Sequence, residues 1–532
     1  MESHNTYHRR RTTVAHVGSV AIGGDNPIRI QSMATVDTND TAGCVAQAKR
    51  IIDAGGELVR FTTQGTREAE NMRNISAQLR ADGYGAPLVA DVHFTAHVAE
   101  VAARYCEKVR INPGNYVDPG RTFKHLEYTD EEYAAELRRI EARLVPLLRI
   151  CKEHHTALRI GVNHGSLSDR IMSRYGDTPE GIVESCMEFL RICRRERFDD
   201  VVISIKASNT VVMVTTVRLL VATMDREDMH YPLHLGVTEA GEGEDGRIKS
   251  AVGIGALLTE GIGDTIRVSL SEEPECEIPV ARKLVELIPE CTRLRAAAEA
   301  SIVDDTIHLT LSAPDWETLQ LKAAMAVGAL LIDKKAKRLI LRVENGESGM
   351  GNYDYSKRSN NPGLQGNHNS QLSTPNSEID ENPGLQGNHN SQFSTLNSEI
   401  DENPGLQGNH NSQLSTLNSR LSSLSDAILQ AARVKFTKTE YISCPGCGRT
   451  LYNLQETIAR IKQATSHLVG LKIGIMGCIV NGPGEMADAD YGYVGAGRGK
   501  ISLYRQKECV AKNIPESEAV ERLLELIARD RE

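Results

Sequence analysis

Short apolar runs alternate with longer amphipathic stretches eight times in the first 290 residues, and this alternation restricts the fold more than any other feature. Strands that alternate with helices form parallel sheets with crossover connections. Eight such units in about 260 residues match the size of a (β/α)8 barrel, a TIM-type barrel. The pattern predicts this α/β barrel over residues 1–290 and leaves a doubly wound open sheet as the alternative. The predicted strands are residues 27–33, 58–63, 88–93, 108–112, 157–163, 200–206, 233–238 and 265–269.

A small α/β region follows the predicted barrel. Residues 291–346 contain a predicted helix, 316–333, between predicted strands at 305–313 and 338–343. The region is too short for an independent domain of ordinary size. We therefore expect a remnant α/β middle region that packs on a larger neighbour.

An internal repeat occupies residues 361–423. Three copies of a 21-residue unit rich in Asn, Gln, Ser and Gly begin at Asn361, Asn382 and Asn403. A segment of this composition buries too little apolar surface to offset the entropy lost on ordering. The composition therefore predicts a flexible linker over residues 347–420.

The last part of the chain, residues 421–532, regains the apolar patterning of a folded domain. We expect a compact α+β domain of about 110 residues, which is a common domain size. Its predicted elements are helices at 421–432, 451–468 and 517–529 and a strand at 471–476.

Polar and charged residues recur near the carboxyl ends of the predicted barrel strands. In a parallel barrel these ends meet at one mouth, and residues two apart on a strand face the same side. Several arginines and a lysine at one mouth are costly unless an anion meets them, and arginine suits bidentate contact with phosphate. The pattern predicts a compact polyanion as ligand, such as a diphosphate, with strand-end salt bridges as the alternative. The residues are Arg60, Asp91, His93, Arg110, Asn112, Arg159, Asn163, Lys206, Glu239, Arg267 and Ser269.

Three of the eleven cysteines are spaced for a metal site. Cys444 and Cys447 form a Cys-Pro-Gly-Cys motif, and Cys478 lies in a second loop rich in Gly and Pro. Such loops let the backbone wrap closely around a metal or a cluster, with N–H groups available to the sulfurs. Seven other cysteines are scattered through the first 300 residues, which fits buried thiols in a reducing cytosol.

The spacing leaves the kind of metal open between two alternatives. A structural zinc ion takes four ligands, and Cys509 or His467 could complete that set. An iron–sulfur cluster can be held by three cysteines, with Glu485 as a candidate oxygen ligand for the remaining iron.

Composition excludes two classes of partner. The formal net charge is −10, whereas nucleic-acid-binding domains carry a basic balance. No apolar run approaches the roughly 18 residues of a membrane span. We therefore expect a cytoplasmic protein that acts on neither nucleic acid nor membrane.

Nine stretches of the chain resemble the 4-hydroxy-3-methylbut-2-enyl diphosphate synthases, iron–sulfur enzymes of the non-mevalonate isoprenoid pathway. The similarity extends over most of residues 1–290 and 430–510, and together the motifs are highly specific. The stretches are Gln31–Met33, Leu88–Phe94, Val109–Asn115, Arg159–Asn163, Ile205–Ser208, Leu233–Ala240, Gly261–Leu270, Cys444–Cys447 and Gly477–Glu485.

The resemblance implies a reaction and a cofactor. The reaction is the reductive ring opening of 2-C-methyl-D-erythritol 2,4-cyclodiphosphate with loss of water, driven by two electrons that pass singly through a [4Fe-4S] cluster. The implied cluster ligands are Cys444, Cys447, Cys478 and Glu485, which favours iron–sulfur over zinc and leaves Cys509 as a bystander. Ferredoxin and flavodoxin are both possible electron donors.

The resemblance also implies roles for the strand-end residues. Glu239 corresponds to an acid near the reacting carbon. The other residues separate into those that bind the anion and those that line the same pocket. The implied anion-binding residues are Arg60, Arg110, Arg159, Lys206, Arg267 and Ser269, and the lining residues are Asp91, His93, Asn112 and Asn163.

The middle of the chain differs from that of the family's larger, three-part class, to which the sequence is otherwise similar. A sizeable extra domain is replaced here by the short α/β region and the repeats. The shortening leaves open whether the cluster domain closes on its own barrel or on that of a partner in a homodimer. A zinc-stabilised barrel that binds anions without catalysis is the competing hypothesis.

Overall fold

Eight parallel strands form a closed barrel in the computed structural model. The structure describes residues 7–118, 127–344, 404–447, 449–450, 452–479, 486 and 488–531, with the side chains of 404–414 excepted. The strand order is β8-β7-β6-β5-β4-β3-β10-β9, and a parallel bridge between Ile203 and Leu233 joins the two ends. The predicted TIM-type barrel is confirmed, and the open sheet is excluded. The strands are β3 (Arg29–Met33), β4 (Leu58–Thr63), β5 (Leu88–Val92), β6 (Lys108–Ile111), β7 (Ala157–Asn163), β8 (Val201–Lys206), β9 (His234–Leu235) and β10 (Thr265–Ile266).

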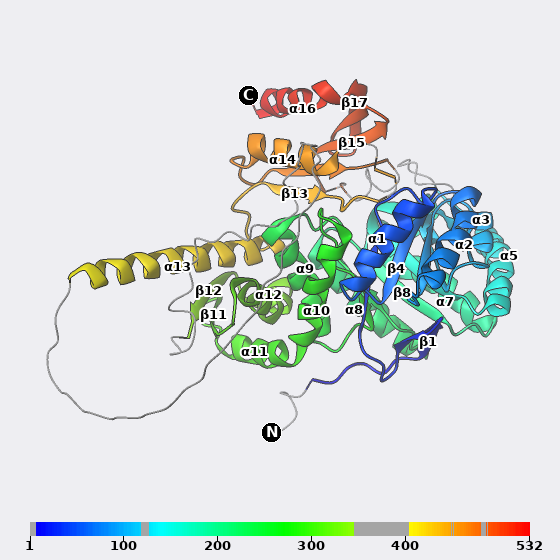
Figure 1. The fold of residues 1–532 in the computed structure, drawn as a ribbon, viewed down its shortest axis with the longest axis horizontal. Coiled ribbons are helices and arrows are strands. Elements are labelled where there is room, and N and C mark those ends of the chain that lie inside the picture. Colours follow the sequence, from blue (N-terminus) through cyan, green and yellow to red (C-terminus); the bar gives the residue numbers. More distant parts are fainter. Residues whose placement is uncertain are drawn as a thin grey trace, which may run out of the picture. The chain divides into compact units, whose positions relative to one another are not determined.

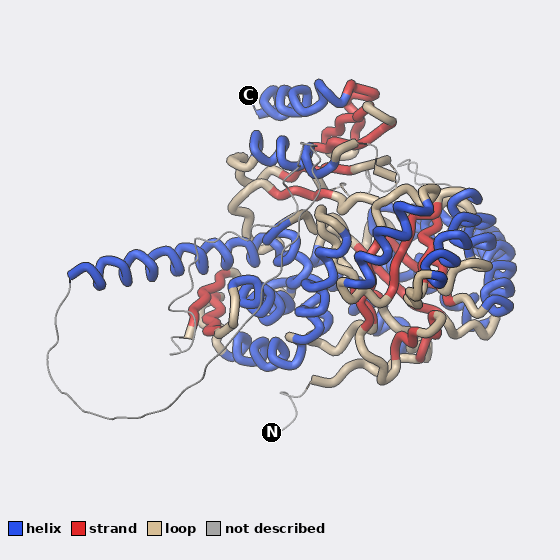
Figure 2. Tube along the Cα trace, in the orientation of Figure 1, coloured by secondary structure: helices blue, strands red, loops and turns tan. Residues whose placement is uncertain are grey.

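Helices surround the strands of the barrel (Figures 1 and 2). Helix α1 (Thr41–Asp53) shows why they form: Asp40 caps its first turn by accepting the N–H of Gly43, and Val45, Ala48 and Ile51 share one buried face. The other helices of this layer are α2 (Thr66–Ala81), α3 (Ala96–Ala102), α4 (Pro113–Tyr116), α5 (Asp130–His154), α6 (Asp169–Tyr175), α7 (Pro179–Arg195), α8 (Thr210–Arg226), α9 (Gly243–Leu258), α10 (Glu277–Glu286) and α11 (Ile288–Ala300).

A β-hairpin covers the amino ends of the barrel strands. Its strands, β1 (Val14–Val17) and β2 (Val20–Gly23), pair antiparallel. Ile22 of the hairpin packs in one buried cluster with Leu58 and Ala157, the first residues of β4 and β7. The hairpin closes this end with apolar contacts, so the carboxyl end is the end available for a site. The sequence pattern did not predict it, because strands of four residues carry little periodicity.

The middle region is a parallel β-α-β unit that packs on the barrel. Its elements are β11 (Thr306–Leu311), α12 (Trp316–Ile332) and β12 (Arg338–Val343), as the sequence predicted. Helix α12 contacts α9 closely because glycine stands at both crossing positions. A Cβ at Gly255 would lie 2.5 Å from Cγ of Met325, and a Cβ at Gly328 would lie 2.7 Å from the carbonyl oxygen of Val252.

Helix α13 (Pro404–Ala431) begins earlier than the sequence predicted. The expected linker extended to residue 420 and the expected helix began at 421; residues 347–403 lie outside the described residues, and residues 404–420 are helical. Pro404 fits the first turn of a helix, and leucines recur at spacings of three and four before the buried Leu421 and Leu424. Once the buried half has formed, extending a helix costs much less than nucleating one.

The described residues of the C-terminal domain form a five-stranded sheet with helices α14 and α16, which confirms the predicted α+β class. The sheet order is β13-β14-β15-β16-β17, and the pairings after β15 are antiparallel. Ile458, Ile473, Tyr493 and Leu523 lie in its buried core. The elements are β13 (Glu440–Ser443), α14 (Leu454–Thr465), β14 (Lys472–Met476), β15 (Tyr491–Gly497), β16 (Lys500–Arg505), β17 (Glu508–Pro515) and α16 (Glu516–Arg531).

The barrel, the middle unit and the C-terminal domain belong to one compact unit, Met1–Glu344 with Leu421–Glu532. Among the described residues, no helix has both the length and the apolar character that crossing a membrane requires.

Candidate active site

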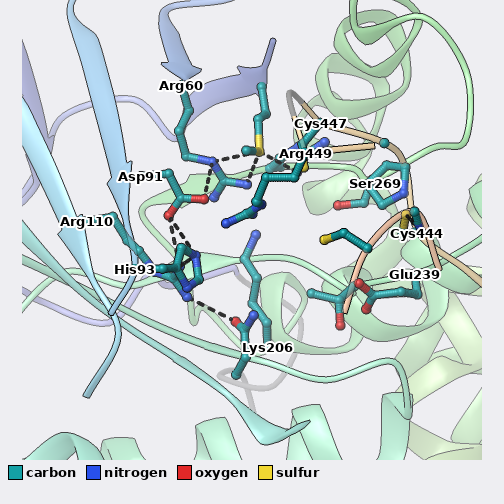
Figure 3. A pocket seen from close by; sticks show the side chains of 18 of the residues that line it. Arg60, Asp91, His93, Arg110, Lys206, Glu239, Ser269, Cys444, Cys447 and Arg449 are labelled. Carbon is teal, nitrogen blue, oxygen red and sulfur yellow. Dashed lines mark hydrogen bonds and ion pairs between the residues drawn. The ribbon is translucent and has the colours of Figure 1, made fainter. Parts of the chain in front are cut away.

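The carboxyl ends of the barrel strands bring most of the predicted site residues to one pocket (Figure 3). The pocket has an empty volume of about 750 Å³. The barrel residues that line it are Met33, Arg60, Asp91, His93, Arg110, Arg159, Asn163, Lys206, Thr238, Glu239, Arg267 and Ser269.

Asn112 is the predicted barrel residue that the structure does not bring to the pocket wall. Its Oδ1 accepts the N–H of Gly114 at 3.2 Å, and its Nδ2 donates to Oγ of Ser166 at 2.7 Å. Both ends of the amide are thus used to hold the start of α4 against the loop after β7. In this arrangement Asn112 supports the pocket from behind.

Asp91 is the centre of a buried polar network on one side of the pocket. Nη1 of Arg110 lies 2.9 Å from Asp91, and Nε of Arg60 lies 3.8 Å from it. Burial alone would raise the pKa of Asp91, but the two guanidiniums hold it well below its usual value. Asp91 is therefore a permanent carboxylate that offsets part of the positive charge.

His93 is held neutral in the same network. Its Nε2 lies 2.5 Å from Nη1 of Arg110, which can only donate, so this nitrogen accepts. Burial, and then the charge of Arg110, lowers the pKa of His93 to about 3. A neutral imidazole in this position orients Arg110 and does not carry a proton to a substrate near neutral pH.

Other cations of the pocket lack matching carboxylates. Nε and Nη1 of Arg159 are buried without a hydrogen-bond partner. Burial and the neighbouring arginines lower the pKa of Lys206, and burial lowers that of Arg60 to about 10. Among the described pocket cations outside the Asp91 network, only Arg267 has a carboxylate within ion-pair distance: Nη2 of Arg267 lies 2.8 Å from Glu277. Salt bridges therefore account for part of the charge, and the remainder favours a polyanion.

Two loops of the C-terminal domain form the opposite wall of the pocket. The loop after β13 contributes Cys444, Cys447 and Arg449 to the lining, and the loop after β14 contributes Gly477 and Cys478. The N–H of Gly477 donates to the sulfur of Cys444 at 3.3 Å. Burial raises the pKa of Cys444 to about 12. Burial would also raise the pKa of Cys447, but the charge of Arg449 together with hydrogen bonds from Arg449 and Thr62 lowers it.

Backbone and side-chain contacts hold the loop after β13, which carries Cys444 and Cys447, directly on the barrel. Ser443 forms a parallel bridge with Ala240, the residue after Glu239. Oγ of Ser271, beyond β10, donates to the carbonyl oxygen of Cys444 at 3.1 Å. Both walls of the pocket therefore come from the same chain.

Ion pairs support this seat at the edge of the pocket. Nζ of Lys249, on α9, lies 3.4 Å from Glu440 at the start of β13. Two further pairs connect the barrel to the C-terminal domain, Lys438 with Asp245 at 2.5 Å and Lys462 with Glu242 at 2.8 Å. The barrel supplies one cation and two anions to these pairs, and the C-terminal domain supplies the opposite charge in each. A shifted contact would bring like charges together, so the pairs favour the observed alignment of the two domains.

Two family models match the two domains that build the pocket. Residues 12–282 match the GcpE TIM-barrel domain, and residues 440–529 match the GcpE protein C-terminal domain. The chain belongs to the GcpE family.

Relatives match the GcpE chain over nearly its whole length. The chain is 53% identical to a protein of Bacteroides fragilis (strain YCH46), with 98% of this chain and 96% of the relative covered. It is 53% identical to a protein of Bacteroides thetaiotaomicron (99% and 98% covered) and 47% identical to one of Porphyromonas gingivalis (98% and 97% covered). Each is named 4-hydroxy-3-methylbut-2-en-1-yl diphosphate synthase (flavodoxin). The first alignment spans 599 positions, so that relative has residues with no counterpart in this chain of 532.

Three cysteines of this GcpE chain line one pocket, where their thiolates are available to a metal centre. Among the described residues, no three Cys, His, Asp or Glu side chains are placed around one ion. Ligands of a [4Fe-4S] cube each bind a different iron and lie further apart. His467 is exposed, and neither it nor Cys509 belongs to the described lining, so neither candidate for a fourth zinc ligand lies at the pocket. Glu485 lies outside the described residues.

Met33 and Arg449 line the pocket of this GcpE chain without having been predicted. Met33 ends β3, and its sulfur contacts the guanidinium of Arg60. An apolar residue at a strand end carries no chemical signal. Arg449 had one, since it stands two positions after Cys447, and a cation so close to a thiolate suggests a charge interaction.

Proposed function

We propose that this chain catalyses the reductive ring opening of 2-C-methyl-D-erythritol 2,4-cyclodiphosphate to 4-hydroxy-3-methylbut-2-enyl diphosphate and water, within non-mevalonate isoprenoid synthesis. The observation that carries the proposal is the pocket with two unlike walls. An excess of buried cations faces three cysteines across one cavity. The names of the relatives agree with this chemistry.

The cationic wall binds and orients the substrate. The diphosphate occupies the side of Arg60, Arg159 and Lys206, where it supplies the negative charge that these groups lack. Arg110 is fixed by Asp91, by the neutral His93 and by the carbonyl oxygen of Gly161, so its guanidinium charge is held in one place and, among the described residues, Nε is the donor left without a partner. Ser269, Asn163 and Arg267 complete the set of substrate-binding residues. Binding energy from the diphosphate thereby places the carbon skeleton toward the cysteines.

The cysteine wall holds a [4Fe-4S] cluster through Cys444, Cys447 and Cys478, with Glu485 as the proposed fourth ligand. When bound, the cluster supplies the two electrons of the reaction one at a time. The N–H of Gly477 supports the sulfur of Cys444, which is a common contact for cluster ligands.

Glu239 supplies a proton close to the reacting carbon. Loss of a hydroxyl as water requires one proton besides the two electrons. Glu239 is buried in the pocket wall on the barrel side of Cys444, so its carboxyl is near both the substrate and the cluster position. Because Glu239 is buried, a proton held on its carboxyl is shielded from direct exchange with bulk water.

Flavodoxin is the proposed electron donor, because the relatives are named as flavodoxin-dependent. We further propose that the protein works in the cytoplasm. All eleven cysteines are free thiols in the structure, as a reducing compartment requires. The proposed domains are the barrel (1–290), the middle unit (291–346), the linker (347–420) and the cluster domain (421–532).

Anaerobic purification followed by metal analysis and turnover tests the proposal. We expect about four irons and four sulfides per chain, a brown colour, and conversion of the cyclic diphosphate with a chemical reductant. Cys478→Ser should lose the cluster and the activity. Cys509→Ser is the matched control, since Cys509 does not line the pocket, and it should keep both. A colourless protein that contains only zinc would support the non-catalytic barrel instead.

A further inference from the structure

The loop that carries Cys444 and Cys447 also places a guanidinium, that of Arg449, in the pocket. Arg449 lines the wall formed by the C-terminal domain, and Figure 3 shows it between the Asp91 side of the barrel and Cys447. The other cations of the described lining come from barrel strands. Arg449 is thus the one described cation that the cysteine side contributes.

The backbone around Arg449 is held in a tight turn. The N–H of Thr450 donates to the carbonyl oxygen of Cys447 at 2.9 Å, and the N–H of Cys447 donates to Oγ of Thr450 at 3.1 Å. These reciprocal bonds fix the chain on both sides of Arg449. A side chain that leaves a fixed turn needs less ordering to hold one position.

The charges around Arg449 lie on both walls. Cys447 and Cys478 act on it from its own side, and Asp91 acts on it from the barrel. Asp91 is itself fixed by Arg110 at 2.9 Å. The Nε of Arg449 is buried without a hydrogen-bond partner, so the side chain is not fully used by the contacts that the structure describes.

A cluster bound by three thiolates and a carboxylate carries net negative charge. Each added electron increases that charge, so a nearby fixed cation stabilises the reduced form more than the oxidised form. In a pocket closed to water this effect is larger than at a surface.

We propose that Arg449 is a positioning residue that raises the reduction potential of the cluster and holds the cysteine loop toward Asp91. The inference rests on the proposed function, because it needs a cluster at the three cysteines.

The test compares Arg449→Gln and Arg449→Lys with the parent full-length protein, all purified anaerobically. Arg460→Gln is the matched control, since Arg460 lies in the same domain, pairs with Glu521 at 3.3 Å and does not line the pocket. Iron and sulfide content, and the midpoint potential from an EPR-monitored titration, are measured with and without substrate.

We expect Arg449→Gln to keep its iron and to shift the midpoint potential to more negative values. Substrate should shift this potential equally in Arg449→Gln and in the parent, because the charge of Arg449 is present with and without it. Arg449→Lys retains the charge and should stay close to the parent, and Arg460→Gln should equal it.

Two results would overturn the inference. One is a midpoint potential in Arg449→Gln equal to that of the parent. The other is loss of the cluster from both Arg449 variants while Arg460→Gln keeps it, because the residue would then act on folding of the loop and not through its charge. Loss from Arg449→Gln alone supports the need for a cation. A parent protein without a cluster would instead refute the proposed function.

Discussion

Replacing Asp91 by Asn should destabilise the protein strongly and make it depend on an anion. Asp91 is 3% exposed, and its carboxylate lies 2.9 Å from Arg110 and 3.8 Å from Arg60. The substitution keeps the shape of the side chain but removes its charge. Breaking a buried ion pair from one side costs about 3–5 kcal/mol, because the partner is left as an uncompensated buried charge.

This free energy converts to a measurable fall in melting temperature. Unfolding entropy is about 2.1 cal/mol/K per residue, so for a barrel of about 290 residues each kcal/mol corresponds to about 1.6 °C. We expect the melting temperature of Asp91→Asn to fall by about 5–8 °C on this scale. Inorganic pyrophosphate should raise it by more than it raises that of the parent, because the ligand replaces the missing negative charge.

Differential scanning calorimetry with and without pyrophosphate provides the measurement. Asp264→Asn is the matched control: Asp264 is also buried, but it accepts the N–H of Leu233 at 2.9 Å at the other end of the strands, outside the pocket lining. Its variant should respond to pyrophosphate as the parent does. If Asp91→Asn melted within 1 °C of the parent, or gained no more from pyrophosphate, the reasoning that the pocket carries excess buried cations would be wrong.

Three further predictions concern the seat of the cysteine loop, the pocket histidine and the repeats. Ser271→Ala removes the hydrogen bond to the carbonyl oxygen of Cys444 and costs about 1 kcal/mol; kcat should fall a few-fold at unchanged iron content, and loss of iron would contradict a role confined to positioning. The pKa of His93 is about 3 in the folded protein against about 6.5 unfolded. Between these two pH values the unfolded state binds more protons than the folded state. The stability that the neutral imidazole contributes is therefore complete above pH 6.5 and declines as pH falls toward 3. NMR should show no protonation of His93 from pH 8 to 5, and a titration near pH 6.5 would refute the assignment. Deleting residues 382–402, one copy of the repeat, should change turnover by less than about twofold, because the mean span of a linker grows only as the square root of its length. A melted or inactive protein would show that the copies are not interchangeable.

Much of the fold was predictable because its signals are local and repeated. The eight barrel strands carry continuous apolar runs, and helices such as α1 combine a cap with a 3.6-residue period. Elements whose formation depends on distant contacts were missed. Strands β1 and β2 are only four residues each and are stabilised by the barrel floor. The early start of α13 was missed because polar repeat residues hide the spacing of its leucines.

The candidate site was predictable to the extent that strand direction decides it. Parallel strands bring their carboxyl ends together, so the charged residues there converge whatever their neighbours. Asn112 fits the same pattern, but a local hydrogen bond to the N–H of Gly114 turns its amide away from the lining. Arg449 was missed because its proximity to Asp91 depends on how the C-terminal domain seats on the barrel.

The central claim is that the cationic wall and the cysteine wall act on one ligand in one pocket. Electron–nuclear double resonance on the reduced, full-length protein with bound substrate tests this directly. The account predicts a phosphorus-31 coupling from the diphosphate to the cluster spin in the parent. It predicts loss of that coupling, with the cluster signal retained, in Lys206→Met, which removes a cation from the opposite wall. A cluster signal that saturating substrate leaves unchanged, with no phosphorus coupling, would contradict the account.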